Sequence, residues 1–401
     1  MPILHMADIN LAGKRVLLRE DLNVPLTAQG EIIDDTRIRA SVDTLRKVIE
    51  AGAKVMVMSH LGRPHEGMHE ESYSLSPVAK RLSQLLTREI PVIRDWLGEN
   101  NVQLGSLNDA DIVILENVRF NVGEKQDDEG LSRRMAALCD VFVMDAFASA
   151  HRAQASTHGV ARFAPIACAG PLLVKEIEAL SKAMQNPAHP VVALVGGAKI
   201  STKLDVLMRL ITKTDQLLVG GGIANTLMLA EGMSIGKSLC EPNLLADAKK
   251  ILKHARTQGT PIPLPTDVIT ADQMSAHAIP QLSQSNSILP NSMILDIGPK
   301  TARHYADILQ RARTIIWNGP VGVFEIAAFS HGTETVGRAI AASNAYSLAG
   351  GGDTVAAIHM LNIADQISYI STGGGAFLEF LAGKALPAIE ILQKRYSEME
   401  S

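Results

Sequence analysis

The chain has 401 residues, enough for two or three domains, and 46% of them are hydrophobic. Asp and Glu (42) outnumber Lys and Arg (38), and the net charge of −4 argues against nonspecific nucleic-acid binding. Three scattered cysteines favour a reduced protein without disulfides. We find no signal peptide and no apolar run of about 18 residues, so we expect a cytoplasmic protein that does not enter a membrane.

The first half of the chain alternates short β-branched runs with helical patterns. Near-continuous apolar runs of this kind are typical of strands buried on both faces of a parallel sheet, with helices as the crossovers. We expect strands in this half at residues 15–21, 54–60, 91–96, 111–120, 141–147 and 166–170.

An amphipathic helical pattern follows, beginning at Gly170-Pro171 and ending at Asn186-Pro187. We interpret residues 171–186 as a helix that links two domains; the alternative is a crossover helix within one large sheet. The second half then shows the same alternation as the first. Its strands are expected at residues 191–195, 216–222, 261–268, 292–298, 314–320, 346–352 and 367–375. The fold class is therefore α/β and doubly wound, and the chain is too long for one sheet.

Two short motifs match known binding signatures without the context that those signatures need. HEGMHE (65–70) matches the zinc motif H-E-x-x-H, which requires a helix so that both His side chains reach one metal. Pro64 and Gly67 disfavour a helix there, so we interpret the segment as a solvated loop. EGMSIGKS (231–238) resembles a P-loop, but its glycines are one residue too close and it follows a helical pattern.

Cationic and hydrogen-bonding residues gather after the strands of the first half. Ligands of open parallel sheets bind beyond the carboxyl ends of the strands, and Arg binds carboxylate and phosphate in a bidentate manner. A single Arg of this kind is most simply a solvated surface charge, but several together predict a site for a small polyanion. The residues of this rim are Asp21, Leu22, Asn23, Arg37, Arg39, His60, Leu61, Gly62, Arg63, Arg119, Asp145 and Arg152.

Glycines take the corresponding positions in the second half. Glycine lets a ligand approach the main chain, and the helix N-termini that follow such turns attract phosphate. One such turn is weak evidence for a ligand site, but the series of turns predicts a nucleotide site built without a P-loop. The turns lie at 196–197, 220–222, 318–320, 350–352 and 373–375.

Charged residues accompany these turns. Lys199 and Lys203 are four apart, so a helical segment would place both on one face, where they suit phosphate oxygens. Asp353 opens a predicted helix, either as its N-cap or as a ligand for Mg²⁺ on a nucleotide. One half thus suits a small acid and the other a nucleotide, which points to phosphoryl transfer across a cleft that closes to exclude water.

Eight segments, in order and over essentially the whole chain, resemble the phosphoglycerate kinase family. They are REDLNVP (19–25), SHLGRP (59–64), LENVRF (115–120), DAFASAHRAQAST (145–157), GGAKISTK (196–203), WNGPVGVFE (317–325), GGGDT (350–354) and STGGGAFLEFLAGKALP (371–387). The resemblance implies a monomer that transfers a phosphoryl group between MgATP and the carboxylate of 3-phosphoglycerate, giving ADP and 1,3-bisphosphoglycerate, in glycolysis and gluconeogenesis.

The resemblance also implies two Rossmann-like parallel-sheet domains joined by a helix hinge. We expect a phosphoglycerate-binding domain at 1–171 with a returning tail at 388–401, the hinge helix at 172–186, and a nucleotide-binding domain at 187–387.

The resemblance also implies roles for single residues. Arg37 and Lys199, with the amides of Gly351 and Gly374, are expected at the transferring group. Phosphoglycerate is expected at Asp21, Asn23, Arg37, His60, Leu61, Gly62, Arg63, Arg119 and Arg152. The nucleotide is expected at Lys199, Lys203, Gly220, Asn318, Glu325 (on the ribose), Gly351, Gly352, Asp353 and Thr354, with Asp353 serving Mg²⁺ largely through the nucleotide.

The chain departs from the family at two places. Glu20 stands at a position that is usually apolar, and Ala148-Ser149 replace the usual Gly-Thr, a change that would shift the loop carrying Arg152. Two other functions were weighed. A nicotinamide dehydrogenase would show G-x-G-x-x-G after a strand, which we do not find. A non-catalytic nucleotide sensor would not need the cationic rim or Lys199.

Overall fold

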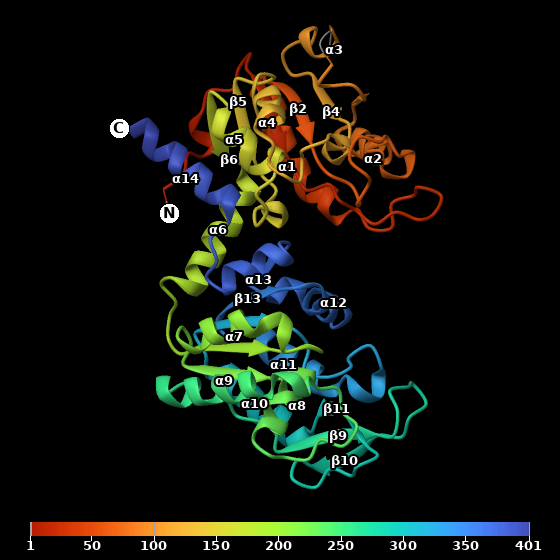
Figure 1. Ribbon diagram of the computed structural model, residues 1–401, viewed down its shortest axis with the longest axis vertical. Coiled ribbons are helices and arrows are strands. Elements are labelled where there is room, and N and C mark those ends of the chain that lie inside the picture. Colours follow the sequence, from red (N-terminus) through yellow and green to blue (C-terminus); the bar gives the residue numbers. More distant parts are fainter. Residues whose placement is uncertain (1, 99–101, 401) are drawn as a thin grey trace. The chain divides into compact units, whose positions relative to one another are not determined.

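The computed structural model describes residues 2–98 and 102–400. It divides into two compact units, unit 1 with Met1–Ile177 and Ala385–Ser401, and unit 2 with Glu178–Lys384 (Figure 1). The division falls inside helix α6 (Pro171–Met184), which covers most of the segment interpreted as a linker. Among the described residues, no helix is both long and apolar enough to cross a bilayer.

Unit 1 is built on a six-stranded parallel sheet with strand order β3-β4-β2-β1-β5-β6. The direction of winding reverses between β1 and β5, and such a switch point opens a crevice at the carboxyl ends of the strands. The strands are β1 (Arg15–Arg19), β2 (Lys54–Met58), β3 (Val92–Ile93), β4 (Ile112–Leu115), β5 (Val141–Met144) and β6 (Ile166–Ala169). The helices are α1 (Thr36–Glu50), α2 (Ser76–Leu86), α3 (Val102–Gly105), α4 (Glu129–Ala136) and α5 (Val160–Phe163).

The core of unit 1 follows from two sequence periods. Helix α1 buries Ile38 and Leu45, which belong to one apolar stripe, in the same cluster as Val16 and Leu18 of β1. Leu17 points to the opposite face of the sheet and is also fully buried. Burial on both faces is typical of parallel sheets and explains the unbroken apolar runs in the sequence.

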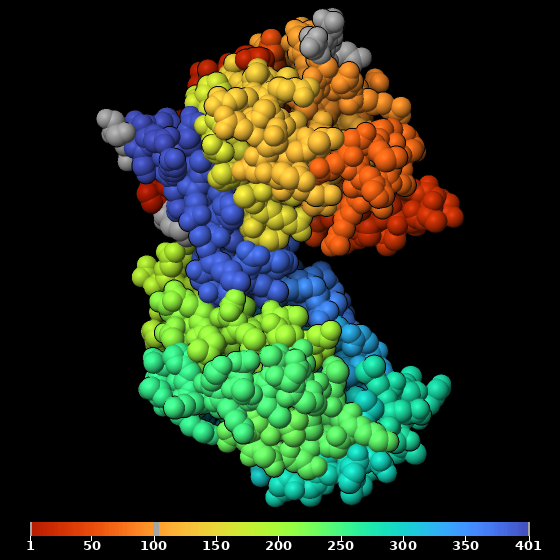
Figure 2. Space-filling model, in the orientation of Figure 1, coloured from red at the N-terminus to blue at the C-terminus, as the bar shows by residue number. Residues whose placement is uncertain are grey.

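The C-terminal helix α14 (Pro387–Glu400) packs on unit 1. The amide of Ala388 donates to the carbonyl of Ala150 at 3.2 Å. The guanidinium of Arg395 donates to the carbonyls of Arg162 at 2.8 Å and Pro165 at 3.1 Å. In Figure 2 this blue segment lies against the yellow and yellow-green surface of the same unit. The end of the chain is therefore fixed by backbone carbonyls around α5.

Unit 2 contains a five-stranded parallel sheet with strand order β14-β13-β12-β7-β8. Its switch point lies between β7 and β12. The strands are β7 (Val191–Val195), β8 (Gln216–Val219), β12 (Thr314–Asn318), β13 (Tyr346–Gly350) and β14 (Tyr369–Ser371). The helices are α7 (Leu204–Ile211), α8 (Gly221–Ala230), α9 (Leu245–Gln258), α10 (Pro299–Arg311), α11 (His331–Ala341), α12 (Gly352–Met360) and α13 (Gly375–Leu381).

A second sheet in unit 2 corrects the sequence analysis. Residues 292–298 were interpreted as a parallel strand, but β11 (Met293–Ile297) pairs antiparallel with β9 (Asp267–Ala271). An apolar run shows burial but not strand direction, which is why the sequence misled. Strand β10 (Gln281–Gln284) was missed because its polar, mostly exposed residues give no apolar signal. The segment expected at 261–268 forms strand only from Asp267 onward.

Candidate active site

The loops after β1 and β2 in unit 1 are fastened to each other by side chains of the predicted rim. Arg37 Nη1 donates to Asp21 Oδ2 at 2.7 Å and to the carbonyl of Asn23 at 3.2 Å. Asn23 Oδ1 accepts from the amide of Gly62 at 2.9 Å. Gly62 has φ +60, and a Cβ there would lie 2.3 Å from the ring of Tyr73, so this turn requires glycine. The structure therefore brings these four rim residues together.

Arg119 lies at the centre of this group and is only 7% exposed. Its Nη1 donates to the carbonyl of Gly62 at 2.5 Å, while its Nε is buried without a hydrogen-bond partner among the described residues. Burial, and then the charges of Arg152 and Arg19, lower the pKa of Arg119 to about 10. The guanidiniums repel one another, and one of their donors has no acceptor among the described residues. A bound anion would reduce the repulsion and accept from that donor.

His60 and Arg152 complete the group of cations. His60 is 5% exposed, and burial followed by the charges of Arg19, Arg119 and Arg152 holds its pKa well below the ordinary value. Arg152 Nε donates to His151 Nε2 at 3.2 Å. Arg152 thus lies within electrostatic reach of the cluster, in a loop that carries the Ala148-Ser149 replacement.

Sequence analysis missed one member of the cluster, Arg19. This last residue of β1 is fully buried, and its Nη2 lies 3.2 Å from His60 Nδ1. The signal that identifies Arg19 is structural, because a fully buried arginine requires a buried partner or a ligand and its burial is not visible in the sequence.

Other rim residues have different surroundings. Asp145 is buried, accepts from Thr44 Oγ1 at 2.7 Å and holds the amide of Leu173 in the first turn of α6 at 2.9 Å. Arg39 pairs with Asp35 at 2.8 Å. Leu61 is buried, with its carbonyl bonded to the Asn117 amide. Leu22 is buried in the core cluster, and Arg63 is exposed but acts electrostatically on Arg119.

The HEGMHE segment forms a turn and no helix, which confirms that structural prediction. Gly67 has φ +80. His65 Nδ1 lies 3.1 Å from Glu70, and His69 Nε2 lies 3.1 Å from Glu71, so each imidazole faces a different carboxylate.

The glycine turns of unit 2 fall into two kinds. Some are needed for close packing of backbone on backbone: a Cβ on Gly196 would lie 1.7 Å from the carbonyl oxygen of Pro320, and one on Gly220 would lie 2.4 Å from Val321 Cα. At Gly352 and Gly374, by contrast, an added Cβ would have no atom of the surrounding structure within 4 Å. The open turns, at the starts of α12 and α13, are the ones that leave space for a ligand.

Lys203 lies at the switch point of the unit 2 sheet. Its ammonium donates to the carbonyl of Gly196 after β7 at 2.6 Å and to that of Asn318 at the end of β12 at 3.0 Å. Burial lowers its pKa to about 8. Lys199 is exposed in an irregular segment, and the 3₁₀ turn Ser201–Lys203 follows it, so the two lysines do not share a helix face.

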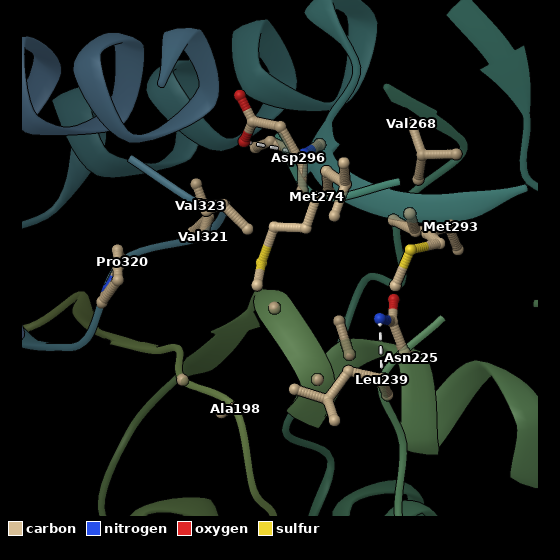
Figure 3. Close-up of a pocket in the computed structure, with 18 of the residues that line it drawn as sticks. Ala198, Asn225, Leu239, Val268, Met274, Met293, Asp296, Pro320, Val321 and Val323 are labelled. Carbon is tan, nitrogen blue, oxygen red and sulfur yellow. Dashed lines mark hydrogen bonds between the residues drawn. The ribbon is translucent and has the colours of Figure 1, made fainter. Parts of the chain in front are cut away.

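A cavity of about 380 Å³ opens beside this switch point (Figure 3). Its walls are largely apolar, and in Figure 3 the side chain of Met274 extends into it. The amide of Asn225 is engaged by the carbonyl of Leu239 at 3.1 Å. Asp296 is buried, accepts from the amide of Gly332 at 2.7 Å, and burial raises its pKa to about 7. Such a volume with apolar walls suits a flat heterocyclic base.

Several predicted nucleotide residues line this cavity or lie next to it. Glu325 and Asp353 are exposed and belong to its lining. Asn318 Nδ2 donates to the carbonyl of Gly350 at 2.7 Å, while its buried Oδ1 has no partner among the described residues. Thr354 Oγ1 donates to Gly350 and accepts from the amide of Gly319 at 2.7 Å, so its hydroxyl joins the two turns.

Sequence reasoning missed the cavity residues that come from the antiparallel sheet, which include Val268 and Met293. It also offered Asp353 as a possible N-cap, but the N-cap of α12 is Gly351, with φ +97, and Asp353 lies in the first turn. Asp353 therefore leaves its carboxylate exposed at the rim of the cavity.

The described residues contain no group of three or more His, Cys, Asp or Glu side chains placed to hold a metal ion. Mg²⁺ is commonly held by one or two carboxylates together with substrate phosphates. The exposed carboxylate of Asp353 at the cavity rim fits that kind of binding.

A cluster of guanidiniums in one α/β unit and a base-sized cavity with open glycine turns in the other are typical of one class, the two-unit α/β phosphotransferases. The sequence model of the family described as phosphoglycerate kinase matches residues 6–384. The chain belongs to the phosphoglycerate kinase family. It is an ATP-dependent kinase of glycolysis that transfers a phosphoryl group between ATP and 3-phosphoglycerate.

Two solved structures illustrate the similarity. Phosphoglycerate kinase from Coxiella burnetii is 52% identical, with a TM-score of 0.93 over 98% of this chain and 100% of that one. Phosphoglycerate kinase from Pyrococcus horikoshii OT3 is 36% identical, with a TM-score of 0.84 over 99% of this chain and 100% of that one.

Proposed function

We propose that the guanidinium cluster of unit 1 holds 3-phosphoglycerate and that the cavity and open glycine turns of unit 2 hold MgATP. The observation that carries this assignment is the buried Nε of Arg119, which has no hydrogen-bond partner among the described residues and lies among cations that lower the pKa of Arg119. A phosphate or carboxylate oxygen supplies the missing acceptor and offsets the repulsion. In unit 2, the apolar cavity walls suit the base, and the backbone amides at the N-termini of α12 and α13 suit phosphate oxygens.

The proposed chemistry is in-line attack of the substrate carboxylate on the γ-phosphoryl group. Two anions must approach, so cations are needed from the protein on both sides of the reaction. We assign Arg37 to the carboxylate side, where its pairing with Asp21 orients the guanidinium, and Lys199 to the phosphoryl side. Lys203 fixes the loops after β7 and β12 through their carbonyls and supplies a second positive charge.

Mg²⁺ enters with the nucleotide in this proposal, and Asp353 is the side chain that would face it. The ion supplies charge neutralisation on the phosphate oxygens. The backbone amides at the start of α12 carry a partial positive charge. They offset the negative charges of the Asp353 carboxylate and of the phosphates, so these groups can lie in one site without a further protein ligand.

A coupled assay with ATP, Mg²⁺ and 3-phosphoglycerate tests the activity, and calorimetry tests the assignment of ligands. We expect Arg119→Met to weaken binding of 3-phosphoglycerate by about 10-fold or more, because a charge-assisted hydrogen bond is lost, and to leave ADP binding unchanged. Arg39→Met is the matched control, since Arg39 pairs with Asp35. Equal loss of both ligands in Arg119→Met would contradict the assignment to separate units.

Transfer also requires the two substrates to meet away from water, so we propose that binding both ligands draws the units together. Small-angle scattering should show a smaller radius with both substrates than with either alone. An unchanged radius in the doubly liganded protein would contradict the closing motion. We further propose a cytoplasmic monomer, and light scattering after gel filtration tests the monomer.

A further inference from the structure

Arg19 uses every nitrogen of its buried guanidinium. Nε donates to Ser156 Oγ at 3.1 Å, and Nη1 donates to the carbonyl of Glu20. Nη2 lies 3.2 Å from His60 Nδ1. Ser156 Oγ in turn donates to Glu124 Oε1 at 2.6 Å. The chain from Glu124 through Ser156 therefore holds the guanidinium in one orientation.

The contact with His60 determines where the imidazole proton lies. A guanidinium has only N–H donors and does not lose its proton in proteins, so His60 Nδ1 must accept from Arg19. An accepting Nδ1 carries no proton, and the single proton of the neutral ring is then on Nε2. A second proton on Nδ1 would face an Arg19 N–H, in a site that also contains Arg37, Arg119 and Arg152.

The other ring nitrogen is left for a ligand. Among the described residues no hydrogen bond to His60 Nε2 is found, and the ring lies within the cluster proposed to hold an anion. A neutral donor adds a hydrogen bond to a charged acceptor without adding to the repulsion among the guanidiniums. The tautomer is therefore a useful property of the site.

We propose that Arg19 is a positioning residue that fixes the Nε2–H tautomer of His60, so that a neutral imidazole donates one hydrogen bond to the anionic substrate. The identity of that anion rests on the proposed function, but the tautomer is a property of the free protein. The two can therefore be tested separately.

The direct test is nitrogen NMR of the full chain with ¹⁵N-labelled histidine, in which the His60 signals are assigned by their absence in His60→Gln. The test variant is Arg19→Met/Glu124→Gln, which removes the donor and the buried carboxylate together, so that neither of these two charges is left buried without the other. The matched control is Arg15→Met/Asp140→Asn, which removes the ion pair at the other end of β1. Circular dichroism establishes that each variant is folded.

In the wild type and the control we expect only the Nε2–H form, unchanged from about pH 8 to about pH 5, because protonation is opposed by burial and four Arg charges. In the test variant we expect a mixture of both tautomers and a ring that takes up a second proton in this range. The proposal is overturned if wild-type His60 carries its proton on Nδ1 or is charged at neutral pH. It is equally overturned if the folded variant keeps the Nε2–H form alone.

Kinetics supply a readout that a merely structural role of Arg19 would not move. We compare the KM for 3-phosphoglycerate of the variant with that of the wild type as a ratio. The titration of the substrate affects both values equally, so it cancels. At high pH this ratio should be at least 1/f, where f is the fraction of the variant in which His60 keeps the Nε2–H form, because only that form donates to the substrate. It should fall on acidification because an imidazolium also donates from Nε2. A ratio independent of pH contradicts the proposal, whereas a wild type that binds no 3-phosphoglycerate refutes the proposed function and leaves the tautomer result intact.

Discussion

In unit 1 the loops beyond the parallel sheet carry guanidiniums, and Arg19 and Arg119 are buried among them. In unit 2 the loops at the same end of a parallel sheet carry glycines, and the half-buried cation Lys203 bonds to two of these loops. Both arrangements lie at a switch point of strand order, where main-chain turns leave an opening. In the proposed function, the same kind of sheet thus serves recognition through fixed side-chain charge in one unit and through backbone and apolar walls in the other.

The difference shows what each ligand requires. A small polyanion has little apolar surface, so its affinity depends on charge-assisted hydrogen bonds from donors held in advance. A nucleotide offers a flat base, which we propose to lie in the cavity of about 380 Å³ with apolar walls, with its phosphates at the glycine turns. Substitutions of charge are therefore expected to act most strongly in unit 1.

The largest effect is expected at Arg37. Arg37→Ala should lower kcat about 10³-fold or more, on the scale of an arginine finger, and Arg37→Lys should also be badly impaired, because an ammonium cannot bridge two anions as a guanidinium does. The alternative role for Arg37 is a surface pairing with Asp34 or Asp35, but in the structure it bonds to Asp21 and Asn23. Steady-state kinetics and thermal melts make the measurement, with Arg39→Ala as control; a near-wild-type kcat in Arg37→Lys contradicts the role.

Lys199 tests whether unit 2 also contributes charge in the transition state. Lys199→Ala should lower kcat by at least about 10²-fold, comparable to the loss of one oxyanion donor, and should change KM for ATP much less. Lys213→Ala, which removes another exposed lysine of the same unit, serves as control. A steep rise in KM at unchanged kcat would make Lys199 a binding residue alone.

Lys203 gives the comparison a pH dependence. Its pKa of about 8 lies below the ordinary value because the ammonium is buried, and bound phosphates favour the charged form. Nucleotide binding should therefore take up a fraction of a proton near pH 8, and affinity for ADP should decline as the pH rises further. Calorimetry in two buffers of different ionisation enthalpy measures the uptake. Lys203→Met should abolish it, and uptake that persists in this variant assigns the proton to another group.

The smallest effect is expected at HEGMHE. His65→Ala and His69→Ala should leave activity unchanged and stability within about 0.5 kcal/mol, because both imidazoles lie on an exposed turn and face separate carboxylates. Thermal melts and elemental analysis measure this. Stoichiometric zinc in the purified wild-type protein that is lost in either variant would contradict the prediction.

The sequence by itself determined the α/β class and most parallel strands, because burial on both faces leaves unbroken apolar runs such as those of β1 and β7. It also placed His60 and Arg119 at the ends of strands, where the ligand residues of such sheets lie. It gave the wrong direction for β11, because pairing partners elsewhere in the chain set strand direction, and it missed β10, whose mostly polar, exposed residues give no apolar signal.

Only the tertiary structure decided how the candidate residues act. It showed that Asp145 fastens α6 instead of facing the rim, and that Gly196 and Gly220 serve backbone packing while Gly352 and Gly374 stay open. It also revealed Arg19, whose position on a strand looks ordinary in the sequence. The physical reason is that burial, hydrogen-bond partners and pKa depend on residues brought close by folding, and spacing along a single chain does not contain them.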